Sequence, residues 1–324
     1  MRKFLNKIIL YLLLLGVLTF FYTLIIYFRP DLVDAFYYKF TTEKANSFIL
    51  GTSRPAQGIK PEIINKLICT EDNEIINHSF AIGPSSYGPN YYREITNKLS
   101  KDSIKGIFVL SVDPWSLATG IGNINDDSLQ FFEARENLFV GNLKSSSNNP
   151  NFDYLLNYWG DKFSPFVQIF KLLINYKNLI VLHSDGWLEV SIAMDSASVN
   201  SRIQKSTEEY KEKKVKLSNT RFYYLDKIIA LLKNKGDVFL VRLPVSSQMA
   251  QLEKDKFSEF DKMVQFYADK NHIKYFNFIE ESGKYRTIDT HHLYKKESER
   301  FTYRLCDSIS THLNTMSSNQ SHTQ

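Results

Sequence analysis

An apolar run from Ile8 to Phe28 constrains this chain more than any other feature of its sequence. The run contains no charged residue and is as long as a bilayer-crossing helix, which needs roughly 20 residues at about 1.5 Å each. A cleaved secretory signal has a shorter apolar core of about 7–15 residues and small residues at its cleavage site, whereas this run ends in Tyr27-Phe28-Arg29. We therefore expect one uncleaved transmembrane helix at 8–28; the alternative is a signal that is cleaved.

The charges on either side of the apolar run indicate its orientation. Three basic residues lie before it, in the segment 1–7, whereas Arg29 after it is soon followed by Asp31 and Asp34. By the positive-inside rule, the basic side stays in the cytoplasm. We therefore expect a single-pass membrane protein with a cytoplasmic N-terminus and a folded part outside the cytoplasm, in a periplasm or on a cell surface.

The net charge argues against one class of partner. The whole chain carries a formal net charge of +5, but its first 30 residues hold four basic residues and no acidic one. The exported part therefore has a net charge of only +1. Such a balance gives no electrostatic reason for binding nucleic acid, so we expect none.

The chain has two cysteines, Cys69 and Cys306, which are too few for a disulfide framework. Neither lies in a Cys-x-x-Cys pair or in a histidine-rich segment, so we expect no metal site. Two alternatives remain open for a protein outside the cytoplasm. The thiols form a disulfide with each other, or both remain free and buried.

Beyond residue 46, strand-like apolar segments alternate with helix-like segments. This alternation is typical of a parallel sheet covered by helices on both faces. We therefore expect an α/β fold, a three-layer sandwich around a doubly wound parallel sheet, preceded by one transmembrane helix. The expected strands are 47–51, 74–77, 104–112, 237–243 and 273–278, and the expected helices are 61–68, 89–99, 223–236, 254–271 and 295–313.

The same pattern predicts the domain boundaries. Residues 29–46 form a connector, residues 47–314 form one folded domain and residues 315–324 form a polar tail. The alternation is interrupted at about 114–220, which predicts an insertion over one end of the sheet. Within the insertion, the charged run from Lys205 to Lys216 is typical of the solvated face of a helix.

A hydroxyl residue lies where the first expected strand ends. The strand runs into Gly51-Thr52-Ser53, so Ser53 comes just after its carboxyl end and before a helix. Ligand sites of open α/β sheets lie at that edge, which suits an exposed nucleophile. The alternative is an ordinary turn, because Gly, Thr and Ser are common turn residues.

A carboxylate and a histidine follow the last expected strand. Asp289 precedes His292 by three residues in the segment 289–293, which reads DTHHL. A serine nucleophile needs a base that takes its proton, and the base needs a carboxylate that holds its tautomer. The loops after the first and last strands open onto one edge when those strands lie near the centre of a doubly wound sheet. We therefore expect Ser53, His292 and Asp289 to meet there.

With these residues the chain resembles the SGNH/GDSL hydrolase superfamily, over the parts of the domain on either side of the insertion. The superfamily's first motif is Gly-Asp-Ser at this turn and its last is Asp-x-x-His; the corresponding segments here read GTSR and DTHHL. The resemblance implies an SGNH- or flavodoxin-like sheet, with Ser53 as nucleophile, His292 as general base and Asp289 as the acid that orients it. His291 is one residue too early for the motif and is the weaker candidate.

Two other motifs of the superfamily are less well matched. The second supplies a glycine whose N–H acts with that of Ser53 in an oxyanion hole; here it is Gly83 or, as the weaker alternative, Gly88. The third supplies an asparagine as a further donor, but the corresponding loop has Asp113, which cannot donate when ionised. Losing one oxyanion donor typically costs about 10²–10³ in rate. The resemblance therefore implies a slow transferase or a weakened enzyme rather than a vigorous general esterase.

The membrane anchor, and Thr52 in place of the usual aspartate, point to divergent branches of the superfamily. Among these are the D-alanyl transfer proteins of teichoic acid synthesis and the alginate O-acetylation proteins, which work beside a membrane-bound O-acyltransferase. The resemblance thus implies such a partner, and an O-acyltransferase or acyl esterase acting on a cell-envelope glycan or an acylated small substrate. The reaction would pass through an acyl-Ser53 intermediate and needs no metal or organic cofactor.

Two further residues are candidates for substrate binding. Arg54 follows the proposed nucleophile, and Asp113 follows the third expected strand. The alternatives are an ordinary salt bridge for Arg54 and a loop-holding role for Asp113. The rival to the enzyme hypothesis is an assembly or glycan-binding subunit that keeps the fold without catalysis.

Overall fold

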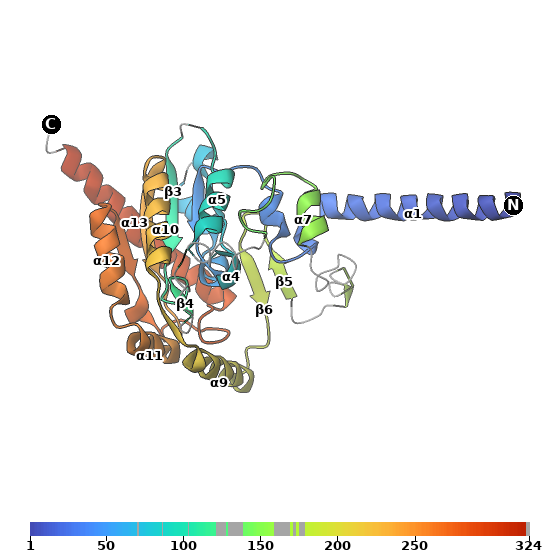
Figure 1. Cartoon of the computed structure of the whole chain (residues 1–324). Coiled ribbons are helices and arrows are strands. Elements are labelled where there is room, and N and C mark those ends of the chain that lie inside the picture. The colour runs from blue at the N-terminus through green and yellow to red at the C-terminus, as the bar shows by residue number, and fades with distance from the viewer. Residues whose placement is uncertain are drawn as a thin grey trace.

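The computed structural model describes most of the chain, and α1 (Arg2–Phe28) is its most separate part. This helix projects from one end of the body (Figure 1), and Ile26 is its one buried residue. It is long and apolar enough to cross a membrane, as expected. The residues described are 1–69, 71–85, 87–102, 104–120, 128, 139–158, 169–170, 173–174 and 179–321.

The centre of the body is a five-stranded sheet whose strands are all parallel to their neighbours. Its order is β2-β1-β3-β8-β9, so the chain moves outward from β1 in both directions, as in a doubly wound sheet. This confirms the predicted α/β fold with a parallel sheet. The strands are β1 (Ser47–Leu50), β2 (Ile75–Asn77), β3 (Gly106–Ser111), β8 (Gly236–Arg242) and β9 (Lys274–Asn277).

Helices cover both faces of the sheet because its strands are apolar on both sides. Phe48 and Phe108 belong to one hydrophobic core, and their neighbours Ile49 and Val109 belong to the other. Successive side chains of a strand point to opposite faces, so each short apolar run contributes to both cores. One face packs against α3 (Pro61–Leu67) and α13 (Lys295–Ser321), and the other against α5 (Pro89–Lys98), α10 (Asn219–Lys233) and α12 (Phe260–Lys270).

The predicted connector 29–46 is an integral part of the body. Its turn η2 (Tyr37–Phe40) packs into the larger core, where the side chains of Tyr37 and Phe40 are fully buried, and its turn η1 (Pro30–Leu32) buries Pro30 and Leu32. The buried ammonium group of Lys39 donates hydrogen bonds to three main-chain oxygens at 2.7–2.8 Å, those of Asn77, Ser79 and Gly186. The chain leaving α1 is thus held firmly against the domain.

The predicted insertion 114–220 forms small elements beside the sheet. Two antiparallel strand pairs, β4 with β7 and β5 with β6, lie outside the central sheet. Five of its segments, at 121–127, 129–138, 159–168, 171–172 and 175–178, lie outside the described residues. The elements are β4 (Ala118–Gly120), α7 (Phe152–Asn157), β5 (Leu179–Leu182), β6 (Leu188–Ser191), α9 (Ser196–Glu212) and β7 (Val215–Leu217).

Two expected helices differ from the structure. The helix expected at 254–271 is two helices, α11 (Ser247–Lys256) and α12, because the backbone leaves the helical region at Phe257 (φ −135°, ψ 51°) and buries that side chain. The last helix, α13, continues through most of the expected tail to Ser321. The remaining short elements are α2 (Ser53–Gly58), η3 (Glu71–Asn73), α4 (Ile82–Ser85) and η5 (Ile279–Glu281).

Candidate active site

Ser53 lies at the carboxyl end of β1, as the first residue of α2. The turn before it requires glycine, because Gly51 has φ +138° and a Cβ there would meet Pro55 at 2.8 Å and Ser111 at 3.0 Å. Tyr91 accepts the N–H of Gly51 at 2.9 Å and so fixes the turn from α5. This local geometry leaves the side chain of Ser53 partly exposed.

The structure brings Ser53, His292 and Asp289 into one chain of hydrogen bonds. The Oγ atom of Ser53 lies 2.8 Å from Nε2 of His292, and Nδ1 of His292 lies 2.7 Å from Oδ2 of Asp289. The side chains of His292 and Asp289 are 14% and 22% exposed, so the site is reachable from solvent. Both distances are within the range over which a base can take a proton from a hydroxyl and a carboxylate can orient the base.

The carboxylate of Asp289 also shapes the loop that carries His292. Its Oδ1 atom accepts the main-chain N–H groups of His291 and His292, each at 2.9 Å, while Oδ2 faces the imidazole. One side chain therefore fixes both the backbone and the ring of the base. The Asp-x-x-His spacing is what permits this, because it places the carboxylate within reach of its own loop.

The loop reaches Ser53 by a route that differs from the expected one. We expected the last strand near the centre of the sheet, but β9 lies at its edge. The loop after β9 returns toward the middle and is held there by the N–H of Ser246, which donates to the oxygen of Thr290 at 2.9 Å. A bond from the N–H of Ile288 to the oxygen of His292, also 2.9 Å, closes the turn.

The helix α9 contacts this loop with a face that sequence reasoning missed. Arg202 donates to the oxygen of Ile288 at 2.6 Å, Ser206 bonds the hydroxyl of Thr290 at 2.7 Å, and the ring of Tyr210 lies 5.1 Å from that of His291. No residue of α9 is buried, in agreement with the solvated face predicted for the charged run. The signal that identifies the contacting face is the i, i+4, i+8 spacing of its three residues.

The two proposed sources of a second oxyanion donor lie in different environments. Gly83 is exposed in α4, and Gly88 is buried at the N-cap of α5. The segment that precedes α4 runs beside the nucleophile turn, because the N–H of Phe80 donates to the oxygen of Gly51 at 3.2 Å. The oxyanion roles of Gly83 and of the Ser53 N–H remain predictions.

Asp113 holds its own loop. Its Oδ1 atom accepts the N–H groups of Trp115 and Ser116 at 2.9 and 3.0 Å, and its other oxygen lies 3.4 Å from the hydroxyl of Thr52. The side chain is 2% exposed. The structure therefore does not support the predicted contact between Asp113 and substrate, and it favours the loop-holding alternative.

Arg54 likewise lies behind the nucleophile rather than in front of it. It is 4% exposed, and its guanidinium donates to Oε1 of Glu253 at 2.5 Å, which matches the salt-bridge alternative. The same oxygen accepts the indole N–H of Trp115 at 2.8 Å, and Oε2 accepts from Arg242 at 2.8 Å. Glu253 is fully desolvated, and it joins the turns after β1 and β3 to the end of β8. Sequence reasoning did not identify Glu253.

The electrostatics of the site favour an ionised Asp289. Burial alone raises the pKa of its carboxyl. The positive charge of His292 and the hydrogen bond that His292 donates have a larger, opposite effect, and they bring that pKa below its usual range. Burial, together with the neighbouring His292, lowers the pKa of His291 well below its usual value. His291 is therefore neutral near pH 7, and its Nδ1 is engaged with the hydroxyl of Thr290 at 2.9 Å.

The same side chains could in principle hold a metal ion. One ligand atom each from Asp289, His291 and His292 lies within 4.8 Å of the others. In the structure, however, both nitrogens of His292 are engaged in hydrogen bonds and so is Nδ1 of His291. An ion would have to displace the contact between His292 and Asp289, and the donor set fits a triad better than a metal site.

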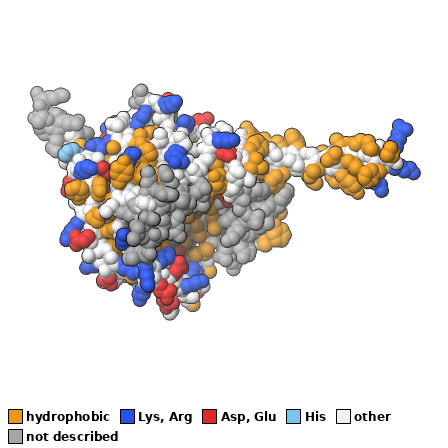
Figure 2. Space-filling view, viewed as in Figure 1, with side chains coloured by type: hydrophobic (Ala, Val, Ile, Leu, Met, Phe, Trp, Pro, Cys, Tyr) orange, Lys and Arg blue, Asp and Glu red, His pale blue; other side chains and the backbone are white. Residues whose placement is uncertain are grey.

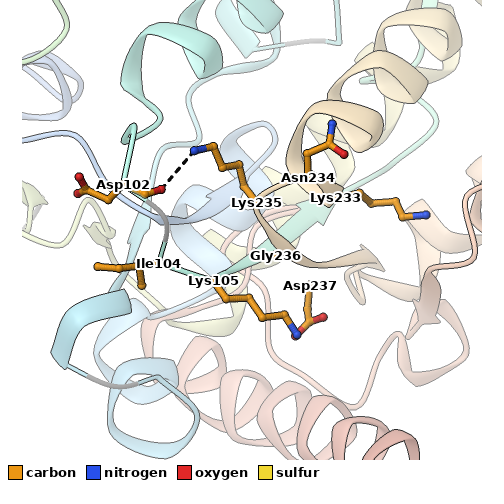
Figure 3. A pocket seen from close by; sticks show the side chains of 8 residues that line it. All are labelled: Asp102, Ile104, Lys105, Lys233, Asn234, Lys235, Gly236 and Asp237. Atoms are coloured by element: carbon orange, nitrogen blue, oxygen red, sulfur yellow. Dashed lines mark hydrogen bonds and ion pairs between the residues drawn. The ribbon is translucent and has the colours of Figure 1, made fainter. Parts of the chain in front are cut away.

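A hollow of about 560 Å³ lies at the opposite end of the same strands (Figure 3). It opens where β3 and β8 begin, whereas Ser53 follows the end of β1. Its lysines are engaged: Lys105 pairs with Asp237 at 2.8 Å, and Lys235 donates to the main-chain oxygen of Asp102 at 3.2 Å. This hollow is not part of the candidate active site.

The two cysteines lie near each other and both are free thiols in the structure. They belong to the core between the sheet and α13, with Cys306 buried and Cys69 partly buried. Burial and the neighbouring Cys69 raise the pKa of Cys306 to about 12. The disulfide between them stays a prediction.

Chemically, the three site residues are arranged for attack by the Ser53 hydroxyl on a carbonyl carbon, with His292 as the proton acceptor. A scan of the sequence against models of known protein families finds no match, and a search of curated proteins finds none. The function of the chain therefore has to be inferred from the site itself.

Proposed function

We propose that this chain is a serine acyl hydrolase or O-acyltransferase that works through an acyl-Ser53 intermediate. The observation that carries the proposal is the unbroken contact from Ser53 through His292 to Asp289, at 2.8 and 2.7 Å. Ser53 and His292 are 239 positions apart in the sequence, so no local turn requirement brings the nucleophile to its base. The three residues are partly exposed at the carboxyl edge of a parallel sheet, and substrates of such folds bind at that edge.

The proposed reaction has two halves. His292 Nε2 takes the Ser53 proton as Oγ bonds to the carbonyl carbon of an acyl ester, and it returns that proton to the leaving oxygen as the ester bond breaks. A water molecule or an acceptor hydroxyl then gives its proton to His292 and attacks the acyl-Ser53 carbonyl, which releases Ser53. Asp289 stays ionised throughout and stabilises the imidazolium that forms in each half.

The proposed setting is the cell envelope. The resemblance to membrane-anchored SGNH proteins and the apolar helix α1 support a tethered enzyme outside the cytoplasm that acts on an acylated glycan or small acyl ester. A membrane-bound O-acyltransferase is the partner that this resemblance implies. A reporter that is active only outside the cytoplasm, fused after Gln324, should be active; an inactive reporter would overturn the orientation.

One observation favours a second function, that of a non-catalytic subunit. Asp113 lies in the loop after β3, where the superfamily places an asparagine donor, and its carboxylate accepts two main-chain N–H groups instead. A site with one oxyanion donor fewer is expected to be slower by about 10²–10³. In the subunit alternative the triad would persist only as a structural motif.

A fluorophosphonate probe separates the two functions. We expect the purified full-length protein to become labelled on the peptide that contains Ser53, because the probe reacts with an activated serine hydroxyl. The Ser53→Ala variant should not be labelled, and the matched variant Ser258→Ala, at an exposed serine, should be labelled like the unchanged protein. Folded protein without any label on Ser53 would favour the non-catalytic subunit.

A further inference from the structure

Apolar side chains are exposed on α7 and on the chain that follows it. Phe152 and Leu156 are four residues apart on one face of this helix, and they are 56% and 83% exposed. Tyr154, on the other side, is 1% exposed and packs into the core of the body. We call the exposed apolar residues here the α7 patch: Phe152, Leu156, Phe170, Leu173, Ile174 and Ile180.

The α7 patch lies at the end of the body from which α1 emerges. The side-chain amide of Asn149 donates to the main-chain oxygen of Tyr27, in the last turn of α1, at 3.5 Å. Tyr154 donates to Asp34, shortly after α1, at 2.6 Å, and β5, which carries Ile180, contacts η1. Figure 1 shows α7 and β5 at this end of the body, and in Figure 2 hydrophobic side chains continue from α1 onto the adjoining surface.

A bilayer that surrounds α1 would end at the level of this patch. α1 is long and apolar enough to cross a membrane and ends at Phe28, so the chain just beyond it would lie in the headgroup region. The transfer of apolar side chains from water into that region lowers the free energy, as it does for helices that lie in the plane of the interface. Contiguous exposed apolar patches mark such contact surfaces, whereas scattered single residues do not.

We propose that the α7 patch is a second membrane-contact surface, which inserts into the lipid interface beside α1. Its occupant is the lipid of the bilayer that α1 crosses, because α7 and β5 are held against the end of that helix and the turn that follows it. Two attachment points hold the body in one orientation above the membrane, whereas a single helix leaves it free to rotate and tilt. The inference requires α1 to lie in a bilayer and is independent of the catalytic proposal.

The test measures the environment of single positions in the full-length protein, reconstituted in lipid nanodiscs. Leu156→Cys is made in a Cys69→Ser background and labelled with the fluorophore NBD; Cys306 is 2% exposed and stays unlabelled in the folded protein. The matched control is Phe266→Cys, at a residue of α12 that is 62% exposed at the other end of the body (Figure 1). A second test position, Leu173→Cys, guards against a local effect at residue 156.

We expect the probes at residues 156 and 173 to emit at shorter wavelength in nanodiscs and to be quenched by lipids that carry a quencher on their acyl chains. The probe at residue 266 should behave as in water and should not be quenched. Probes at 156 and 173 that match the one at 266 would overturn the proposal. Burial of these probes in detergent, increasing with protein concentration and without lipid, would indicate contact between copies of the chain and would also overturn it.

Discussion

The two ends of the central strands hold charged groups in different ways. At the amino ends, Lys105 and Asp237 form an ion pair at 2.8 Å between the starts of adjacent strands, with side chains 71% and 34% exposed. At the carboxyl ends, Ser53 and His292 meet from loops far apart in the sequence, and the fully buried Glu253 lies behind them. Exposed pairs contribute little free energy, whereas partly buried chains of hydrogen bonds depend on every member. The polar groups at the carboxyl edge thus surround one hydroxyl oxygen atom, that of Ser53, and the catalytic proposal rests on this difference.

The largest expected effect comes from removing that atom. Ser53→Ala should abolish hydrolysis of an activated ester such as p-nitrophenyl acetate, because no other hydroxyl contacts His292 among the described residues. In a related triad, loss of the nucleophile costs on the order of 10⁶ in rate. The circular dichroism spectrum should be unchanged, since the substitution is small and partly exposed. Full activity in a folded Ser53→Ala variant would mean that the hydroxyl of Ser53 is not the reactive group, and the proposed difference between the two edges would fail.

The second effect is that of releasing the base. Asp289→Asn should lower the rate by about 10⁴, because an amide no longer holds the required tautomer of His292. The change also weakens the two main-chain bonds that Oδ1 accepts, so the loop should be checked by limited proteolysis. A loss of rate below about tenfold, with the loop intact, would show that Asp289 has only a structural role.

The third effect concerns the buried residue behind the site. Glu253→Gln leaves the guanidinium group of Arg54 without its carboxylate partner in a desolvated position, whereas Arg242 keeps Asp261 as a partner. Breaking a buried pair in this way typically lowers the free energy of unfolding by about 3–5 kcal/mol. Urea unfolding should show this loss, and the rate should also fall because Arg54 follows the nucleophile directly. A stability equal to that of the unchanged protein would mean that Glu253 does not hold the two loops.

The fourth effect is the contribution of His291 to the pH dependence of stability. The pKa of the partly buried His291 lies well below its usual value, so between that pKa and about 6.5 the unfolded chain binds more protons than the folded one. The free energy of unfolding should therefore rise with pH over this window, by at most about 1.4 kcal/mol per pH unit from this residue, and the gain is lost as pH falls. His291→Gln should reduce the slope measured by urea unfolding. An unchanged slope would contradict the assignment.

The smallest effect is expected at the amino edge. Lys105→Gln removes one partner of a largely exposed ion pair and should change the free energy of unfolding by less than about 0.5 kcal/mol. Ester hydrolysis should stay at the level of the unchanged protein, since the hollow in Figure 3 lies at the other end of the strands. A strong loss of activity here would break the contrast between the two edges.

The parts that could be predicted from sequence are those that depend on local patterns. Alternating apolar segments indicate the strands and most helices, and the rule that ligands bind at carboxyl ends places Ser53 and the loop 289–293 at one edge. The Asp-x-x-His spacing also predicts which histidine faces Asp289, because three residues is the separation that lets the carboxylate reach both backbone and ring.

The parts that could not be predicted depend on contacts between distant segments. Arg54 and Glu253 are 199 residues apart, and neither has a local feature that indicates its partner. The charged run in α9 reads as solvated, and most of it is, yet one face of the helix contacts the loop of His292. The break between α11 and α12 at Phe257 likewise depends on a distant contact, since the ring of Phe257 lies 5.1 Å from that of Trp115, on the loop after β3.

The most direct test of the central claim is to trap the intermediate. The full-length protein is mixed with p-nitrophenyl acetate, quenched in acid within one turnover and digested for mass spectrometry. We expect one acetyl group on the peptide that contains Ser53, more of it in the first seconds than at steady state, and none in Ser53→Ala. Ester hydrolysis without acetylation of Ser53, or acetylation that persists elsewhere in Ser53→Ala at the same rate, would contradict an acyl-enzyme at this residue.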